Sequence, residues 1–187
     1  MKTLIFSLLF IAVTFVGTAQ DQKITQLEEA TVGFTPLDAK ITQNGDSFSY
    51  SVNEAYTGEF SKDPIAFMKA NFDINNFITE FEGDKYTSYQ VTLSSSNGRL
   101  TADFNGDGEL VKTYQKFKDI VLPLDVRRDL YMSNQGWSMT SNKYIASGRG
   151  EILEKEAYKI KLENGKQKRN VKLDPRSVAR TTVASNN

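Results

Sequence analysis

The sequence predicts an α+β fold, in which helices cover one face of an antiparallel sheet, and three observations lead to that class. Two segments show the alternation of apolar and polar residues that is typical of β-hairpins. A segment with a proline in the first turn of an expected helix precedes each hairpin. The two hairpins also match at a fixed separation, because Tyr158 comes 69 residues after Tyr89. A tandem repeat of helix and antiparallel meander is therefore expected.

Residues 1–19 have the pattern of a cleavable signal peptide. Lys2 provides a positive start, Leu4 to Val16 is an almost unbroken apolar run, and small residues precede Gln20. The run of about 13 residues is shorter than the roughly 20 that cross a bilayer. We therefore expect a mature chain that begins at Gln20 and is periplasmic or secreted. The chain has no cysteine, so neither a lipoprotein anchor nor a disulfide is expected.

The mature chain is expected to contain an N-terminal extension, two repeats and a tail. The extension, 20–60, has a hairpin that turns at Asn44-Gly45. The first repeat, 61–119, is expected to have a helix over 64–71 and strands near 74–82, 86–94, 99–105 and 110–118. The second repeat, 120–176, is expected to have a helix near 123–133 and strands near 138–146, 156–163 and 167–174. Residues 177–187, rich in serine, threonine and asparagine, are expected to form a flexible tail.

The alternation within the two hairpins predicts which side chains face the core. The first hairpin turns at Asn97-Gly98 and the second at Asn164-Gly165. The inward residues of the first are Tyr89, Val91, Leu93, Leu100, Ala102 and Phe104. Their counterparts in the second are Tyr158, Ile160, Leu162, Arg169, Val171 and Leu173.

Several of these motifs together resemble the PepSY-like family of secreted Bacteroidetes proteins. They are the order of helix and meander, Tyr-x-Val-x-Leu before an Asn-Gly turn, the stretch ADFNGDGELVKTY, the linker LPLDV and the second Tyr-x-Ile-x-Leu hairpin. The resemblance covers roughly residues 60 to 175. It implies a fold similar to that of the beta-lactamase inhibitory protein, and a binding module with peptidase or lactamase inhibition as the suggested activity. No inhibitor loop motif matches, so the resemblance assigns no inhibitory residue.

Residues 102–110, ADFNGDGEL, begin like a calcium-binding EF-hand loop, with Asp103, Asn105 and Asp107 at alternate positions. Such a loop needs a bidentate carboxylate at its twelfth position, which here is Tyr114, and a helix on each side. We therefore expect a structural turn at Asp107-Gly108, with a weak calcium site as the alternative. A two-residue turn predicts the cross-strand pairs Phe104–Val111, Asp103–Lys112 and Thr101–Tyr114.

The residue types argue against an enzyme. The chain has no histidine, which removes the commonest general base and the usual zinc ligands, and it has no P-loop or nucleophile elbow. Glu80, Glu82 and Asp84 are the remaining carboxylate cluster. We interpret them as the solvated face of a strand, because Phe81 alternates with Glu80 and Glu82. No catalytic activity and no cofactor are expected.

The polar face of the two hairpins is the candidate binding surface. It is expected to hold Lys112, Tyr114, Lys116, Lys159, Lys161, Lys168 and Lys172. Tyr114 should point away from the core, unless the N-terminal segment 30–60 covers it. The leading hypothesis is a module that binds a protein or peptide in the cell envelope, with neither nucleic acid nor membrane insertion involved. The alternatives are a solvated lysine face without a ligand, and a small-ligand-binding or structural envelope protein with an apolar cavity.

Overall fold

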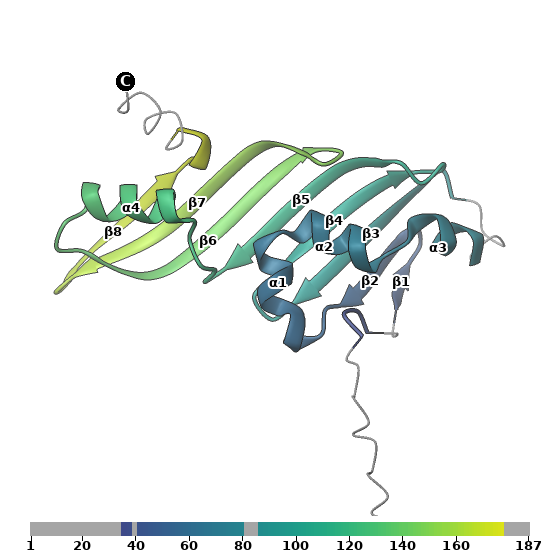
Figure 1. Ribbon diagram of the computed structural model, residues 1–187, viewed down its shortest axis with the longest axis horizontal. Coiled ribbons are helices and arrows are strands. Elements are labelled where there is room, and N and C mark those ends of the chain that lie inside the picture. Colours follow the sequence, from purple (N-terminus) through teal and green to yellow (C-terminus); the bar gives the residue numbers. More distant parts are fainter. Residues whose placement is uncertain (1–34, 39–40, 81–85, 178–187) are drawn as a thin grey trace, which may run out of the picture. The chain divides into compact units, whose positions relative to one another are not determined.

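The computed structural model describes residues 35–38, 41–80 and 86–177 (Figure 1). Their strands are β1 (Thr42–Asn44), β2 (Ser47–Ser51), β3 (Ser88–Ser95), β4 (Gly98–Asn105), β5 (Leu110–Lys118), β6 (Ser138–Arg149), β7 (Ile152–Asn164) and β8 (Gln167–Leu173). The helices are η1 (Glu54–Tyr56), α1 (Thr57–Lys62), α2 (Pro64–Asn71), α3 (Ile74–Glu80) and α4 (Leu124–Ser133). The predicted α+β class is confirmed. The predicted signal peptide and the tail from residue 178 onward lie outside the described residues.

The described strands form one sheet of eight, arranged in sequence order. Neighbouring strands are antiparallel, except that β2 and β3 are parallel. A parallel pair needs a long crossover connection, and here η1, α1, α2 and α3 lie within it. The predicted hairpin at Asn44-Gly45 is confirmed as β1–β2, with Gly45 at a φ of +60°. Its parallel attachment to β3 was not predicted.

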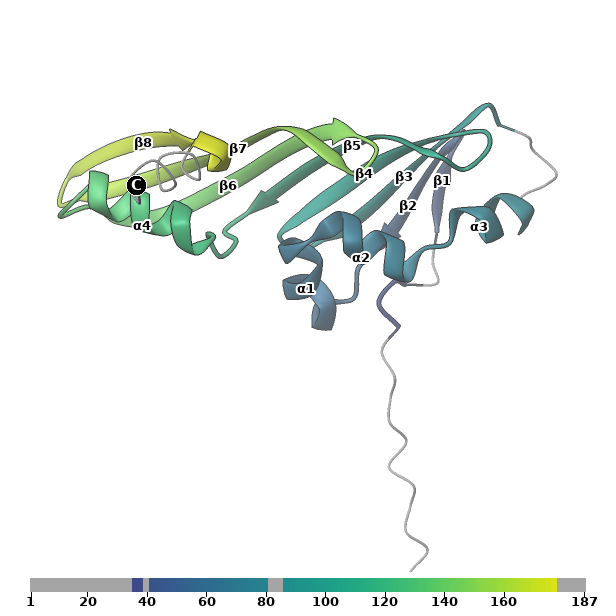
Figure 2. The ribbon, with the colours of Figure 1, turned by 45° about the horizontal axis from the view of Figure 1, so that its top comes forward.

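The two predicted meander hairpins are present with the predicted inward faces, but each turn is shifted by one residue, to Ser96-Asn97 and to Gly165-Lys166. Tyr89 pairs with Phe104 across β3–β4, and Ile160 pairs with Val171 across β7–β8. The turned view in Figure 2 shows the strands from β3 to β8 side by side. Alternation of polar and apolar residues was therefore sufficient to orient these hairpins, because a slip of one residue would turn the apolar set outward.

The helices predicted at Pro64 and Pro123 are also confirmed. Asp63 caps α2, since its side chain accepts a hydrogen bond from the backbone N–H of Ala66 at 3.1 Å. Pro64 occupies the first turn, where its missing N–H has no helical partner to lose. Pro123 precedes α4 directly. Both helices bury apolar side chains in the same core cluster as the sheet, among them Phe67 of α2.

The strand predicted over residues 74–82 is wrong, because residues 74–80 form the helix α3. Asp73 caps the helix, and its side chain accepts from the backbone N–H groups of Asn75 at 2.9 Å and Asn76 at 3.1 Å. Phe77 is buried, with its ring centroid 4.7 Å from that of Phe48 on β2. Tertiary burial thus overrides the β-propensity of the isoleucine, phenylalanine and threonine in this short segment.

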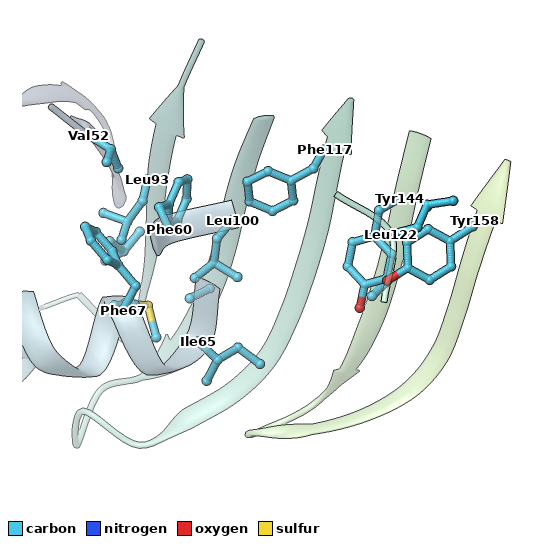
Figure 3. Packing of buried hydrophobic residues seen from close by; sticks show 14 of the residues in the cluster. Val52, Phe60, Ile65, Phe67, Leu93, Leu100, Phe117, Leu122, Tyr144 and Tyr158 are labelled. Atoms are coloured by element: carbon cyan, nitrogen blue, oxygen red, sulfur yellow. The ribbon is translucent and has the colours of Figure 1, made fainter. Parts of the chain in front are cut away.

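The extension 20–60 contains helical structure that was not predicted. After β2 the chain forms η1 and then α1, which carries the fully buried Phe60. The Phe60 ring lies 5.2 Å from that of Phe117 on β5 and 5.2 Å from that of Phe67 on α2, measured between centroids. Figure 3 shows these three rings among the buried residues of the cluster. The described part of the predicted extension therefore contributes buried residues to the same core as the first predicted repeat.

Candidate functional site

The outward face of β5 is defined by a strict alternation of buried and exposed side chains. Thr113, Gln115 and Phe117 are buried on the inward side. Tyr114 is 38% exposed, and Lys116 on the same face is also exposed. The predicted outward orientation of Tyr114 is thus confirmed, and the described part of the N-terminal extension does not bury it.

A row of four lysines crosses this outward face at right angles to the strands. Lys118 of β5 pairs with Lys143 of β6, Lys143 pairs with Lys159 of β7, and Lys159 pairs with Lys172 of β8. We call these residues the lysine row. Neighbouring strands lie about 4.8 Å apart, so the row extends over roughly 14 Å. Like charges placed directly opposite each other destabilise a sheet, and this register places four in succession.

The lysine row lines a shallow hollow of the sheet surface. This hollow has a volume of about 480 Å³, and Lys161 and Asn170 line it together with the four lysines. A second hollow of about 370 Å³ is lined by Lys118 and Lys143, and also by Arg99 and Lys116. The two hollows share Lys118 and Lys143 and make one continuous basic surface.

None of the ion pairs among the described residues involves the lysine row. One carboxylate, that of Asp119, lines the same hollow and accepts a hydrogen bond from the backbone N–H of Asn142 at 3.2 Å. Two further carboxylates of this face also have partners. Asp103 accepts a hydrogen bond from the side chain of Gln90 at 3.0 Å, and Glu163 forms an ion pair with Lys168 at 3.2 Å. Lysines therefore outnumber carboxylates in the hollow, and the net positive charge is available to a ligand.

The seven predicted binding residues lie on this face in different settings. Lys159 and Lys172 belong to the lysine row, and Lys161 lines the same hollow. Lys168 is paired with Glu163, and Lys112 lies opposite Asp103. Tyr114 and Lys116 lie on β5, opposite Ser147 and Ile145 of β6.

Sequence reasoning missed Lys118, Lys143 and Arg99. The register between β5 and β6 places Lys118 opposite Lys143, but these two strands are separated by the long connection that includes α4. The sequence did contain a signal for Lys143. It directly precedes Tyr144 in a strand whose alternate residues are buried, so its side chain points to the opposite, outward face.

The loop between β4 and β5 differs from the predicted two-residue turn. Gly108 has a φ of +81°, but Asp107 has no positive φ, as a two-residue type I′ turn would require. Instead the Asn105 side chain accepts from the backbone N–H groups of Asp107 at 3.1 Å and Glu109 at 2.8 Å. These bonds stabilise a longer loop, which belongs to the Asx class of turns.

The longer loop changes one of the three predicted pairs. Asp103 does lie opposite Lys112, and Thr101 opposite Tyr114. A register shift after Asp103 pairs Phe104 with Leu110 instead of Val111. The predicted pair Phe104–Val111 is therefore wrong, and Val111 is 51% exposed.

The alternative of a calcium site at Asp103, Asn105 and Asp107 gains no support. Asp103 accepts a hydrogen bond from Gln90 on the sheet, while Asn105 caps its own loop. Within the described ranges, no group of three or more histidine, cysteine, aspartate or glutamate side chains is placed to hold a metal ion.

Millimolar calcium is expected to leave the melting temperature unchanged to within about 1 °C, because the loop lacks the twelfth-position carboxylate and a cation that does not bind the folded state cannot stabilise it. Differential scanning fluorimetry of the protein with calcium and with a chelator measures this. The Asp107→Asn variant is the control and should behave like the parent. A rise of several degrees that is absent in the variant would instead establish a calcium site.

The predicted carboxylate strand face is wrong at Glu80, the part of the cluster that the structure describes. Glu80 ends the helix α3, where its side chain accepts from Asn76 at 3.2 Å. Glu82 and Asp84 lie outside the described residues.

A cavity lies on the inward side of the sheet, between the helices and β6–β7. It has a volume of about 980 Å³, and its lining includes Ile65 of α2, Leu122 of the linker, and Tyr144 and Tyr158 of neighbouring strands. Figure 3 shows the two tyrosines side by side near Leu122, with both hydroxyl oxygens on the same side. Their ring centroids are 4.9 Å apart. We call this space the inner cavity.

The inner cavity shifts the titration of its tyrosines. Burial, and secondly the negative charge of Glu156, raise the pKa of Tyr158 from 10.0 to about 12. Burial is also the main cause that raises the pKa of Tyr144, and Glu156 is the next. Desolvation in turn raises the pKa of Glu156 above its ordinary value. Both hydroxyl groups therefore stay protonated at neutral pH.

Stability is expected to fall as the pH rises from 10 toward 12. In this window the unfolded chain releases the Tyr158 proton while the folded chain, with a pKa of about 12, retains it, so folding weakens with rising pH. Urea denaturation at pH 9, 10 and 11 should show a shallower decline for Tyr158→Phe than for the parent. Equal slopes for the two proteins would contradict this assignment.

Comparisons with protein-family models, curated proteins and solved structures find no match to this chain. The PepSY-like resemblance therefore stays a prediction from the motifs. In the part of the chain that the structure describes, no helix has the length and apolar character needed to cross a membrane.

Proposed function

We propose that this chain is an exported, non-enzymatic binding module, and that its outward sheet face binds an acidic segment of a protein or peptide in the cell envelope. The lysine row is the observation that carries this proposal. Inhibition of an envelope enzyme, such as a peptidase, is the proposed consequence of binding. The absence of histidine and cysteine from the sequence supports a role without catalysis.

The lysine row is costly for a face that serves only solubility. A solvated sheet gains stability when opposite charges alternate across strands, at about 0.2–1 kcal/mol for each pair, and it loses stability when like charges meet. Lys143 has a lysine opposite it on both sides. Residues that lower stability and hold no partner of their own are expected where a ligand supplies the missing charge.

The dimensions and surroundings of the row favour a polypeptide ligand. A span of roughly 14 Å matches several carboxylates on one chain better than a single small anion. Apolar groups lie beside the row, because Ile145 pairs with Ala157 and Tyr114 is exposed on the neighbouring strand. An exposed tyrosine offers contact area with little conformational entropy to lose. The chain has a formal net charge of zero, which argues against nucleic acid as the ligand.

We also infer that the sheet is a tandem repeat with its helices on one face. The separation of 69 residues supports the repeat, since Tyr89 and Tyr158 are both buried and pair with Phe104 and Leu173, which have the same separation. The shared core cluster supports the placement of the helices, because α1, α2, α3 and α4 each contribute at least one buried residue to it. The outward face would then be open to a partner.

Replacing Lys143 with glutamate is expected to raise stability and weaken binding at the same time. The change removes two lysine–lysine contacts and creates two opposite-charge pairs, so the free energy of unfolding should rise by about 0.5–1 kcal/mol. The affinity for a fluorescein-labelled glutamate-rich peptide that contains aromatic residues should fall at least about tenfold. Urea denaturation and fluorescence anisotropy at low ionic strength measure the two effects.

Lys166→Glu is the matched control, because it makes the same change of charge in the exposed turn between β7 and β8. Lys166→Glu should change neither the free energy of unfolding nor the affinity for the peptide by more than a small amount. Binding by the parent should also weaken as salt is added, since exposed charges are screened. If Lys143→Glu binds the peptide as tightly as the parent, the outward face is not the binding site.

A small-ligand-binding protein of the envelope is the second candidate function. The observation that favours it is the inner cavity, which is lined by apolar side chains and by the hydroxyl groups of Tyr144 and Tyr158. This cavity is on the opposite side of the sheet from the lysine row, so the two functions do not exclude each other.

A further inference from the structure

Three polar side chains that line the inner cavity have no side-chain hydrogen bond to any other described residue. They are Gln115 of β5, which is only 2% exposed, and the buried Tyr144 and Tyr158. Among the described residues, no side-chain hydrogen bond reaches the Gln115 carboxamide or either phenol hydroxyl. Because these polar groups have access to the cavity, they can bond to water or to a ligand that enters it.

These polar atoms are open to the cavity. No side-chain nitrogen or oxygen that is fully enclosed in the described structure lacks a hydrogen-bond partner. The free amide of Gln115 must therefore keep some accessible surface, and the cavity that Gln115 lines is the space that provides it. The amide and the two hydroxyls thus line one and the same space.

The remaining lining is mostly apolar. Ile65 and Pro64 contribute from α2, Leu122 from the linker before α4, and Leu153 from β7. The volume of about 980 Å³ lies within the range of sites for small organic molecules, which combine apolar walls with a few polar groups that orient the ligand. The cavity therefore fits a molecule with an apolar body and a small polar end.

The charges around the cavity argue against an anionic ligand. Glu156 acts on both tyrosines, and Asp63 acts in addition on Tyr144, so the hydroxyl groups lie in a negative potential. Two lysines and two carboxylates line the cavity, so their formal charges cancel: Lys69 forms an ion pair with Glu151, and Lys62 is followed directly by Asp63. The two hydroxyls remain protonated and can donate hydrogen bonds, which suits a neutral acceptor such as a carbonyl oxygen.

We propose that the inner cavity binds a small uncharged molecule with an apolar body and a carbonyl or amide group. The carbonyl oxygen accepts hydrogen bonds from the Tyr144 and Tyr158 hydroxyls, and the Gln115 carboxamide bonds to a second polar atom or shares the first. This site is separate from the lysine row and does not depend on a protein partner.

The probe for this proposal is Nile red, an uncharged apolar dye that carries a carbonyl group and fluoresces when it leaves water. Titration of the full mature chain should show one saturable site. The Tyr144→Phe/Tyr158→Phe double variant should bind about tenfold more weakly, because two hydrogen bonds are lost with little change in shape. Leu153→Trp should abolish saturable binding by filling the cavity. Tyr131→Phe, on the exposed side of α4, is the matched control and should bind like the parent.

Unchanged affinity in the double phenylalanine variant, or in Leu153→Trp, would overturn the proposal, as would the absence of saturable binding by the parent. An anionic dye, 1-anilinonaphthalene-8-sulfonate, should bind at least tenfold more weakly than Nile red. Equal affinity for both dyes, with equal dependence on the tyrosines, would overturn the uncharged class of ligand. Lys143→Glu should leave Nile red binding unchanged. The proposal for the inner cavity can therefore fail while peptide binding by the outward face is confirmed, and the reverse also holds.

Discussion

Ile160→Ala is expected to lower the free energy of unfolding by about 2–5 kcal/mol, whereas Tyr114→Ala should lower it by less than about 1 kcal/mol. Ile160 is 1% exposed on the inward face of β7, where its removal leaves a cavity that the surrounding strands cannot close. Tyr114 lies on the outward face and keeps much of its surface in solvent. Urea denaturation of the two variants and the parent gives both values.

Ile152→Ala is the matched control, because it removes the same atoms from a residue that is 75% exposed. Its effect should lie within about 0.5 kcal/mol of zero. Tyr114→Ala should in addition weaken the binding of the acidic peptide, since it removes apolar contact area next to the lysine row. If Tyr114→Ala were as damaging as Ile160→Ala, the tyrosine would be covered in the folded chain. The proposed binding face would then lose its main aromatic residue.

Gly148→Ala is expected to destabilise the protein by about 3 kcal/mol or more, a cost typical of severe overpacking. A Cβ atom at this position would clash with the carbonyl oxygen of Ile152 and would lie 2.8 Å from the Cα atom of Leu153. Both are backbone atoms, so no side-chain rotation can relieve the clash. The pairing of β6 with β7 is already irregular next to Gly148, and the hairpin would have to open there.

The control for this substitution is Gly58→Ala. A Cβ atom at Gly58 meets no atom within 4 Å, and the residue lies in α1, where alanine is the better helix former. This variant should be as stable as the parent or more stable by up to about 1 kcal/mol. Thermal or urea denaturation that shows the two alanine variants to be equal would contradict the close backbone approach at Gly148.

The parts of the fold that could be predicted from the sequence are those set by local patterns. Each meander hairpin combines an alternation of two residues with a tight turn, so the shared inward orientation of Ile160 and Val171 follows from the sequence alone. The helix at Pro64 was found for a similar reason, because its cap and its first turn are adjacent in the chain.

The parts that could not be predicted depend on contacts between distant segments. The segment from Ile74 to Glu80 is helical because Phe77 is buried against Phe48 and Tyr89, and no pattern within seven residues reveals this. The parallel pairing of β2 with β3 has no turn to set its register. Both errors therefore fall in the region where the sheet meets the N-terminal part of the described chain.

The candidate site was predictable to the same limited extent. Alternation placed Tyr114 and Lys159 on a polar face, but it could not align lysines that belong to different hairpins. The lysine row exists because β5 and β6 pair in a register that places Lys118 opposite Lys143. The inner cavity was even further from prediction. Gln115 alternates in step with the inward residues of β5, such as Phe117. The alternation predicts that its side chain points inward, but not that it lines a cavity.

The order of the strands leaves β1 and β8 as the outer edges of the described sheet, and unpaired backbone groups at such edges can template aggregation with another copy. β1 has only three residues, which is too short for a stable ladder. β8 carries Lys168, Arg169 and Lys172 within seven residues, so two such edges repel each other. Both edges of the described sheet therefore disfavour edge-to-edge polymerisation, which keeps the outward sheet surface available even at high protein concentration.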